Sequence, residues 1–476
     1  MAKSQQSTFT KQHLRKYQKE GINEIHQSFR EGLKRVIFHL STGGGKSITF
    51  SSIVWDHYIN NLPVIVVVKR RQLIDQASKN LDNFRIPHGV LMANHWRKKP
   101  NEKIQIASID TIHSRSNYHY SDDPRCLVIV DECHDVRGSG AKYPKLFEVY
   151  DKSYIVGFTA TPYADNSFFQ KIVCPIEGYE LRDQGFLVPE RTYIPSSIDV
   201  SQVKSSGGDY NKKQLFEASS GSQIIGDIVK SWKTHAEGRA TLLFAVNVEH
   251  SKMIRDKFLA EGISAVHLDA NDSLDARKKA LNKLSQGLIK IITNCDVMST
   301  GVDIPMVSCI QLARPTRSVI WHIQSIGRGL RPFPGKKDCI IIDNAGNTLR
   351  HGSIYMPRIA TIEKRKKRLD PLPMMRTCAK CYFIFTTLGP CPQCGFADKK
   401  VRNIDYVEGD LIHHQVSEEE IRKTHFLNRY KTLRKAARFG KKKWIPSYEY
   451  QQLKKEFGVD ICKKFSNLVS FPGHLL

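Results

Sequence analysis

The sequence has no run of eighteen or more apolar residues, the length that a helix needs to cross a bilayer. Its first twelve residues, MAKSQQSTFTKQ, contain no apolar stretch of the kind found in secretory signals. We therefore expect a cytoplasmic protein with no membrane partner. Its 40% hydrophobic and 25% charged residues are ordinary for a globular chain, and 476 residues allow about three domains.

Acidic residues are too few to balance the basic ones. The chain has 47 Asp and Glu against 73 Lys and Arg, a formal net charge of +26. This excess suits a polyanionic partner, because binding releases condensed counterions, although it also serves plain solubility. Residues 361–476 alone hold 24 basic and 12 acidic residues. We therefore expect a basic, nucleic-acid-binding region over residues 401–476, with Lys442 and Trp444 as candidate contacts.

The cysteines lack a disulfide framework. They number eleven, an odd count, and most are scattered, so we expect reduced thiols. The exceptions form a CAKC and a CPQC pair nine residues apart, Cys378, Cys381, Cys391 and Cys394. Each CxxC can place two thiolates on one metal ion from a tight turn. The spacing predicts a structural Zn²⁺ in a zinc ribbon over residues 361–400; the alternative is two coincidental pairs.

Strand-like apolar runs alternate with helical patterns along the rest of the chain, as in parallel α/β proteins. The first series comprises residues 35–40, 63–68, 103–108, 126–131 and 154–159. The second series comprises residues 241–246, 265–269, 289–294, 308–313 and 338–343, with an amphipathic helix expected over 274–286. Residues 165–225 have the mixed pattern of a connector. The sequence therefore predicts an α/β fold with two similar parallel sheets in tandem.

A glycine-rich string, STGGGKS at residues 41–47, follows a predicted strand and precedes a helical pattern. In that setting glycine N–H groups can curl around phosphates, Lys46 can reach the β and γ oxygens, and Ser47 can bind Mg²⁺. Ser41 stands where the commonest form of this loop has glycine, and the string taken alone also fits a chance turn. We predict that ATP is bound here, by Thr42, Gly43, Gly44, Gly45, Lys46 and Ser47.

Two adjacent carboxylates follow the strand predicted over residues 126–131. Asp131 ends that strand and Glu132 comes next. A carboxylate beside a phosphate-binding loop can hold the Mg²⁺ shell, and a second one can activate the attacking water. We therefore predict Asp131 as the metal-side group and Glu132 as the base; the alternative is that both only cap a strand end.

Five strings in order resemble motifs I, II, III, V and VI of the superfamily 2 helicases: STGGGKS, DECH (131–134), GFTATP (157–162), STGVDIP (299–305) and QSIGRGLRP (324–332). The resemblance covers residues 10–350 and implies two RecA-like halves that form one ATPase site. LRKYQ at 14–18 resembles the Q motif, which implies an adenine contact by Gln18. Residues 324–347 and the following cysteine-rich segment resemble RadD-like and XPB/UvsW-like DNA helicases, which include phage branch-migration enzymes.

The resemblance also implies roles for single residues. Arg328 and Arg331 would act as arginine fingers on the γ-phosphate, with Gln324 beside them. Gly301 and Asp303 would lie on the ribose or Mg²⁺ side of the nucleotide. His134, Thr159 and Thr161 would relay the nucleotide state. The expected nucleic-acid contacts, each alternatively a solvated surface residue, are Arg70, Arg71, Thr111, Asn247 and Thr300.

The expected domains are a first RecA-like domain over 1–195, a linker over 196–225, a second RecA-like domain over 226–360, the zinc ribbon and the basic region. The predicted activity is ATP-dependent unwinding or branch migration of branched or forked DNA in replication, recombination or repair. We expect a monomer that works with single-strand-binding or recombination proteins. The alternatives are a duplex-translocating motor of a restriction or remodelling machine, an RNA helicase, and a non-enzymatic zinc-ribbon adaptor. The intact Lys46, Asp131, Glu132, Arg328 and Arg331 argue against the adaptor.

Overall fold

The structure is a computed structural model of the whole chain. The residues that it describes are 14–115, 120–121, 123–136, 140–163, 166–194, 205–206, 209–210, 222–299, 303–358, 360, 362, 376–377, 384–385, 412–414, 416–439 and 446–465. Within these ranges, no helix is both long and apolar enough to cross a membrane. The chain divides into two compact units, residues 1–352 with 361–414, and residues 353–360 with 415–476.

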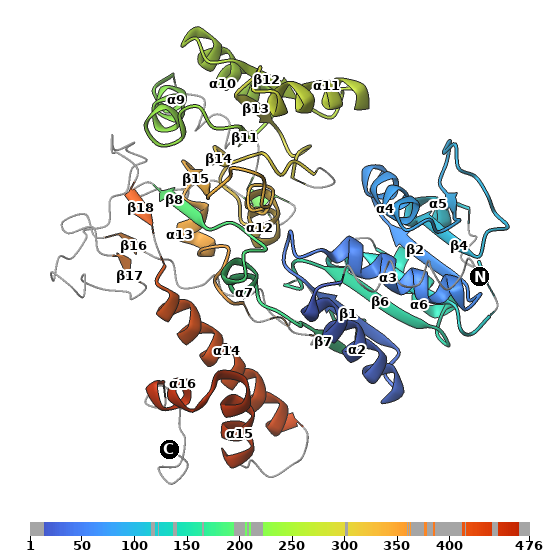
Figure 1. The fold of residues 1–476 in the computed structure, drawn as a ribbon. Helices are drawn as coiled ribbons and strands as arrows, with labels where there is room; N and C mark the ends of the chain where they lie inside the picture. The colour runs from blue at the N-terminus through green and yellow to red at the C-terminus, as the bar shows by residue number, and fades with distance from the viewer. Residues whose placement is uncertain are drawn as a thin grey trace. The chain divides into compact units, whose positions relative to one another are not determined.

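The first compact unit begins with a seven-stranded parallel sheet in the order β3-β4-β2-β5-β6-β1-β7 (Figure 1). Its strands are β1 (Arg35–His39), β2 (Val64–Val68), β3 (Gly89–Leu91), β4 (Ile104–Ser108), β5 (Leu127–Asp131), β6 (Tyr154–Thr159) and β7 (Lys171–Val173). Its helices are α2 (Lys16–Arg30), α3 (Lys46–Ile59), α4 (Arg71–Asn83), α5 (Ile109–Ser114), α6 (Lys142–Val149) and α7 (Gly178–Asp183). All five strands predicted for the first series are present.

The central strands of this sheet are uninterrupted apolar runs because both of their faces are covered. Every residue of β2, VIVVV, is buried, the pattern expected for a parallel strand packed between helices. β2 pairs with β4 from Val64↔Ile104 to Val68↔Ser108 and with β5 from Val64↔Leu127 to Val67↔Val130. The carboxyl ends of these strands therefore meet at one edge, where the motif residues lie.

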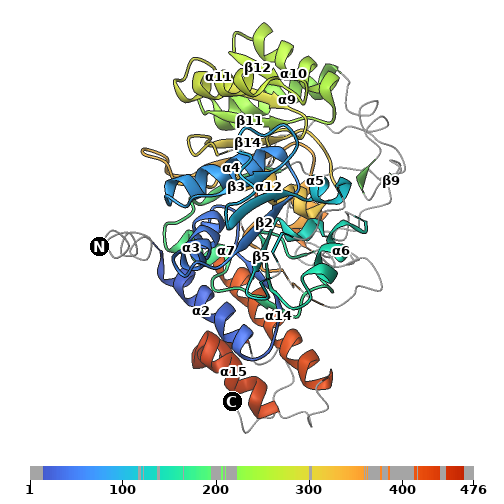
Figure 2. The same cartoon turned by 90° about the vertical axis from the view of Figure 1, so that its right-hand side faces the viewer.

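A second seven-stranded sheet follows in the order β12-β13-β11-β14-β15-β8-β18. Its strands are β8 (Glu190–Ile194), β11 (Thr241–Phe244), β12 (Ala265–Leu268), β13 (Ile291–Asn294), β14 (Cys309–Leu312), β15 (Cys339–Asp343) and the antiparallel β18 (Ile412–His414). Its helices are α9 (Ser222–Ala236), α10 (Val248–Ala260), α11 (Leu274–Ser285), α12 (Val319–Ile326) and α13 (Asn347–His351). Figure 2 shows α9, α10 and α11 beside β11 and β12. The predicted pair of parallel α/β sheets is confirmed.

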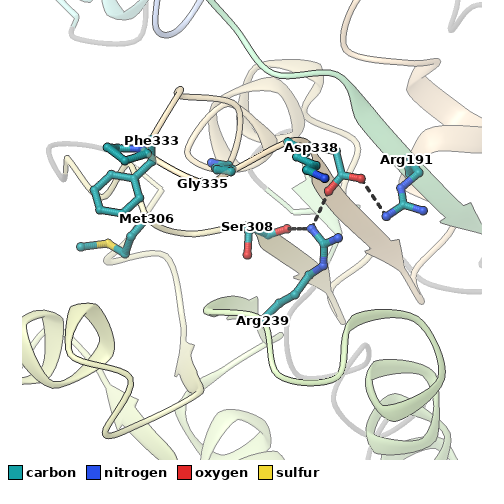
Figure 3. Close-up of a pocket in the computed structure, with 10 residues that line it drawn as sticks. Arg191, Arg239, Met306, Ser308, Phe333, Gly335 and Asp338 are labelled. Atoms are coloured by element: carbon teal, nitrogen blue, oxygen red, sulfur yellow. Dashed lines mark hydrogen bonds and ion pairs between the residues drawn. The ribbon is translucent and has the colours of Figure 1, made fainter.

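The division between the sheets differs from the expected boundary at residue 195. β8 lies within the expected first domain, yet it pairs with β15 of the second sheet from Cys339↔Glu190 to Ile342↔Tyr193. An ion-pair cluster fixes its start, since Asp338 lies 2.7 Å from Arg191 and 2.6 Å from Arg239 (Figure 3). These side chains line a cavity of about 420 Å³ that contains none of the predicted site residues.

Short strand pairs occur in the expected linker and ribbon. β9 (Ser205–Ser206) pairs with β10 (Asp209–Tyr210), and β16 (Arg376–Thr377) pairs with β17 (Ile384–Phe385). Asp209 accepts hydrogen bonds from Arg317 N–H at 2.6 Å and Thr316 Oγ1 at 2.7 Å. The β9–β10 pair is therefore tied to the loop that follows β14.

The second compact unit is helical. It contains α14 (Glu418–Phe439), α15 (Pro446–Phe457) and α16 (Val459–Lys464). Its core consists of Phe426, Tyr430, Tyr450, Leu453, Cys462 and Phe465. An ion pair of 2.7 Å between Arg429 and Glu456 also joins α14 to α15. Part of the expected basic region is therefore a small helical unit with its own core.

Candidate active site

The glycine-rich loop between β1 and α3 has the backbone shape of a phosphate cradle. Gly43 and Gly45 have φ angles of 87° and 90°, in the left-handed region that glycine enters without steric cost. A Cβ at Gly43 would lie 2.6 Å from the Leu187 side chain. α3 begins at Lys46, so the free N–H groups of its first turn are available to an anion.

Helix α2 holds this loop through two side chains. The Tyr17 hydroxyl donates to the Gly44 carbonyl at 2.7 Å. Gln18 Nε2 donates to the Gly44 and Gly45 carbonyls, both at 3.3 Å, and its Oε1 accepts from Arg15 N–H at 2.8 Å. Both ends of the Gln18 amide are thus bonded within the protein, and its adenine contact stays a prediction.

The two carboxylates after β5 sit in a strained turn. Glu132 has a φ angle of 50°, which is uncommon for a residue other than glycine. Burial raises the pKa of Asp131, and the charge of Glu132 adds to the rise. Burial also opposes ionisation of Glu132, but Lys46 and His134 outweigh it and lower the pKa of Glu132. Lys46 and His134 therefore favour the charged form of Glu132, the form that a general base needs.

His134 connects this turn to β6. Its Nδ1 lies 3.2 Å from Glu132 Oε2 and 3.0 Å from Thr159 Oγ1. The same nitrogen lies 3.5 Å from Thr161 Oγ1, and Thr161 N–H donates to Thr159 Oγ1 at 3.0 Å. A single ring nitrogen therefore faces both the predicted base and the two threonines predicted to relay the nucleotide state.

The motif VI arginines follow α12. Arg328 is 8% exposed, and its Nε donates to the Ser299 carbonyl at 2.9 Å. Burial, with the nearby charge of Arg331, lowers the pKa of Arg328 to about 10, so the group is still a cation at neutral pH. Arg331 forms an ion pair with Asp303. The structure thus brings three predicted residues of motifs V and VI together.

Residues from both sheets line one cavity of about 370 Å³. The first sheet and its loops contribute Thr42, Gly43, Gly45, Lys46, Ser47, Asp131 and Glu132. The segments around the second sheet contribute Asp303, Gln324, Arg328 and Arg331. The two sets approach closely, since a Cβ at Gly327 would lie 2.7 Å from the Thr42 side chain. Such a lining of cations, glycines and carboxylates can hold a polyphosphate together with a divalent metal ion.

The predicted nucleic-acid contacts that the structure describes begin helices at the carboxyl edges of the two sheets. Arg70 caps α4 and Arg71 is its first residue, and both are exposed. Thr111 lies in α5, and its N–H donates to Ser108 Oγ at 3.5 Å. Asn247 caps α10, where its Oδ1 accepts from His250 N–H at 2.7 Å. Their contacts to nucleic acid stay predictions.

The remaining predicted site residues lie outside the described residues: Thr300, Gly301, Lys442, Trp444, Cys378, Cys381, Cys391 and Cys394. Across the parts of the chain that are described, no group of three or more side chains is arranged to hold a metal ion. The predicted zinc ribbon therefore stays a prediction.

Two groups in the cavity wall had not been predicted. The Arg15 guanidinium lies 3.9 Å from the centre of the Phe186 ring, and both residues line the cavity. Arg15 belongs to the LRKYQ string, but the resemblance of that string to the Q motif implied a role only for Gln18. Phe186 follows α7 in the expected connector, where no motif marks it.

Lys336 is a third group that the sequence analysis missed. Its Nζ lies 3.0, 2.5, 2.5 and 2.9 Å from the carbonyl oxygens of Pro305, Val307, Gly329 and Arg331, which share its three protons. The ammonium therefore ties the segment after Asp303 to the backbone of motif VI.

Two protein families match parts of this chain. The family described as "Type III restriction enzyme, res subunit" matches residues 11–164. The "Helicase conserved C-terminal domain" matches residues 222–332. The first match contains motifs I to III, and the second extends from α9 to the end of motif VI.

Two individual proteins are similar to this chain over most of its length. A 51.5 kDa protein of a Lactococcus phage (isolate 7-9) is 32% identical over 315 residues, which cover 65% of this chain and 65% of that protein. The putative ATP-dependent helicase IRC3 of Saccharomyces cerevisiae is 28% identical over 355 residues, which cover 70% of this chain and 51% of the relative. The chain thus spans between about half and two thirds of the length of these relatives.

A solved structure shares the fold. The fragment of a putative HsdR subunit of a type I restriction enzyme from Vibrio vulnificus YJ016 matches with a TM-score of 0.51 at 20% identity, covering 69% of this chain and 64% of that one. The tandem RecA-like fold is therefore supported. Together, the two matched domains, the helicase relative and the motif geometry support the assignment of this chain to helicase superfamily 2.

Proposed function

We propose that this chain is an ATP-hydrolysing motor that moves on nucleic acid. The observation that carries the proposal is the shared cavity, in which Lys46 and Glu132 face Arg328 and Arg331. A site built from two halves can be complete only when both halves are in place. Closing and opening of the two halves would then be coupled to each round of hydrolysis.

The chemistry follows from the charges in the cavity. Lys46 and the loop N–H groups bind the β- and γ-phosphates, and Glu132 orients the attacking water and accepts its proton. Arg328 and Arg331 stabilise the charge that develops on the transferred phosphoryl group. Asp131 and Ser47, which line the same cavity, would hold Mg²⁺, which when bound neutralises phosphate charge.

The His134 contacts offer a route from hydrolysis to movement. Glu132 Oε2 and Thr159 Oγ1 lie 3.2 and 3.0 Å from His134 Nδ1, so a proton on that nitrogen would have two competing acceptors while Glu132 is charged. When Glu132 takes up a proton from water, that competition changes, and the bonds around β6 change with it. This makes His134 the first residue through which the state of the site reaches the rest of the sheet.

We further propose that the substrate is DNA, in branched or forked form. The resemblance of residues 324–347 to RadD-like and UvsW-like enzymes supports this, and the net charge of +26 suits any nucleic acid. Measuring stimulation of the ATPase by single-stranded, duplex, forked and four-way DNA, and by matched RNA at one salt concentration, tests the proposal. Forked or four-way DNA should stimulate most, and a preference for linear RNA duplex would overturn it.

The central experiment removes the groups in the cavity. Lys46→Ala loses a phosphate contact and Glu132→Gln loses the base, so each should abolish stimulated ATP hydrolysis. Lys145→Ala and Glu148→Gln, at exposed positions of α6, are matched controls and should hydrolyse ATP like the wild type. Wild-type turnover in either cavity variant would remove that residue from the mechanism.

A second candidate is a motor that translocates on duplex DNA without separating strands. The match to a restriction-enzyme family and the fold shared with an HsdR subunit favour it. The two candidates differ in one assay pair. A translocase displaces a third strand from a triplex but does not unwind a fork, whereas the proposed helicase also releases the forked strand.

We also propose that Cys378, Cys381, Cys391 and Cys394 bind one structural Zn²⁺. Four thiolates close a tetrahedral shell and leave no place for a reactive water. Elemental analysis should find about one zinc per chain, as the four-ligand count implies. Cys391→Ser with Cys394→Ser should lose the metal and weaken binding to branched DNA but keep basal ATPase. Metal-free wild-type protein with undiminished DNA affinity would contradict the proposal.

A further inference from the structure

Trp96 is an exposed aromatic side chain that the proposed ATPase does not use. It is 78% exposed, more than any other large hydrophobic residue among those described. It lies in the segment HWRKKP, residues 95–100, between β3 and β4. A solvent-facing indole forgoes the stabilisation that burial of so large an apolar surface brings. Tryptophan is enriched at interfaces, where its ring can contact a partner while one edge stays in water.

The indole is held in place. The Arg97 guanidinium lies 4.6 Å from the Trp96 ring centre. Arg97 is in turn fixed by a two-pronged ion pair with Asp82, at 2.5 and 2.9 Å, and by His88 Nε2 at 2.7 Å. Burial lowers the pKa of His88 and so favours the neutral ring. Its Nδ1 lies 2.8 Å from the Ile86 carbonyl, which leaves Nε2 able to accept. Arg97 therefore supports the indole as part of a fixed network.

The loop around the indole is also anchored. Val90 N–H donates to the Arg97 carbonyl at 2.9 Å, which ties the loop to β3. Gln105 Nε2 donates to the carbonyls of Lys99 and Glu102 at 2.7 and 2.9 Å, which ties it to β4. A rigid loop loses little conformational freedom when it binds, so the exposed ring is preorganised for a partner.

The position and charge of the loop favour a polyanion. His95 Nε2 lies 3.3 Å from Asp75 Oδ1 in α4, the helix that begins with the exposed Arg70 and Arg71. Asp82 is already paired with Arg97, whereas Lys98 and Lys99, two and three residues after Trp96, are exposed. An aromatic ring flanked by lysines matches a nucleotide, whose base stacks and whose phosphate is an anion.

We propose that Trp96 is a stacking platform for an unpaired base of a single-stranded nucleic acid, with Lys98 and Lys99 receiving the adjacent phosphates. The inference rests on the proposed function and deepens it by naming a base contact outside the motifs. Stacking accepts every base, since each has an aromatic face, so the contact suits a motor that must move over any sequence. A protein partner is the competing occupant of the same surface.

The first test uses the fluorescence of the indole. Among the five tryptophans of the chain, Trp55 and Trp232 are each only 2% exposed. Oligo(dT) should quench the wild type more than Trp96→Phe, and the difference between the two isolates Trp96 from the remaining tryptophans. Oligo(rU) tested in parallel distinguishes DNA from RNA as the source of the base. Equal quenching of both proteins by both oligonucleotides overturns the inference.

The second test separates bases from phosphates. Trp96→Ala should bind oligo(dT) about five-fold or more weakly, as expected for one lost stacking contact. Its affinity for an abasic oligonucleotide of the same length should equal that of the wild type, because the phosphates are unchanged. Trp96→Tyr should recover most of the lost affinity. Leu288→Ala removes another exposed apolar side chain, 63% exposed, and should change neither affinity.

The outcomes distinguish this inference from the proposed function. If oligo(dT) stimulates the ATPase of the wild type and Trp96→Ala binds it equally well, the platform is wrong and the motor stands. If Trp96→Ala weakens binding to oligo(dT) and to the abasic oligonucleotide equally, the stacking role is wrong. A protein partner lost in Trp96→Ala while nucleic-acid affinity is unchanged also overturns it. If no nucleic acid binds or stimulates the wild type, both proposals fail.

Discussion

His250 is buried at the start of α10, where its ring has to be neutral, because Nδ1 accepts a hydrogen bond from Val246 N–H at 3.3 Å. Burial lowers the pKa of His250 from 6.5 to about 4. Between these values the unfolded chain binds a proton that the folded chain does not. The free energy of unfolding therefore falls as the pH falls from 6.5 towards 4, by about 3 kcal/mol for this one group.

His250→Gln should remove that part of the pH dependence, since an amide oxygen can accept from Val246 N–H without titrating. Urea denaturation at a series of pH values between 4 and 7 measures the effect. His113→Gln, at an exposed position of α5, is the matched control and should keep the wild-type slope. A slope in His250→Gln as steep as in the wild type would mean that other groups cause the acid sensitivity.

Arg331 lines the same cavity as Lys46 and Glu132, and as an arginine finger it should act mainly in the transition state. Arg331→Ala should lower kcat for stimulated ATP hydrolysis by about 10³ or more, as for other arginine fingers, with much less effect on KM. Steady-state kinetics with saturating nucleic acid measure both. Arg317→Ala, an exposed arginine near α12, should leave both constants unchanged. A rise in KM alone would make Arg331 a binding residue instead.

The sequence predicted the site residues that lie within motif strings, because the order and spacing of these strings are set by the chemistry of the ATPase site. It missed residues whose role comes from contacts between distant segments. Tyr17 reaches the Gly44 carbonyl across 27 positions, and Phe186 enters the cavity from a connector with no motif. Lys336 is one of several lysines after motif VI, and only the structure shows four carbonyls around its ammonium.

The helical unit is the element most open to a stability test, because its core is small. Phe426 is fully buried and contacts the rings of Phe457 and Phe465 at 5.5 and 5.7 Å between centres. Phe426→Ala should destabilise this unit by about 3–5 kcal/mol, the usual cost of such a truncation. So small a unit has little stability to lose.

Limited proteolysis of the full chain measures this effect. Phe426→Ala should be cleaved within residues 418–465 much faster than the wild type, while basal ATPase is retained. Lys423→Ala, at an exposed position of the same helix, should be as resistant as the wild type. Loss of basal ATPase in Phe426→Ala would show that the motor needs this unit.

Long apolar strands between helices were predictable as elements, and ten of them appear within two residues of their expected limits. The remaining strands could not be predicted from the sequence, because they are short or only partly buried. β3 and β7 have three residues each, too few for a pattern. β8, ERTYI, is only half-buried, with glutamate and arginine at its start, and its partner β15 lies about 150 positions further along the chain.

For the whole molecule, the net charge of +26 predicts steep salt dependence of nucleic-acid binding. Affinity should fall by about 10³ or more between 50 and 200 mM salt if six or more phosphates are neutralised. Arg70→Gln with Arg71→Gln should reduce the log–log slope by roughly 0.7 for each lost contact to a single strand. Lys278→Gln with Lys279→Gln removes the same charge from α11 and should leave the slope unchanged.

β8 precedes residue 195 in the sequence but belongs to the second sheet. This placement matters when the two halves are expressed separately. A recombinant first half that ended at residue 195 would carry β8 without β15 or β18, its two partners. An orphan strand offers unpaired N–H and C=O groups to other chains and promotes aggregation. Ending the first half at Gly185, and running the second from Phe186 to His414, keeps every strand with its own sheet. Complementation between two soluble fragments is therefore expected for a cut after α7 but not for one after β8.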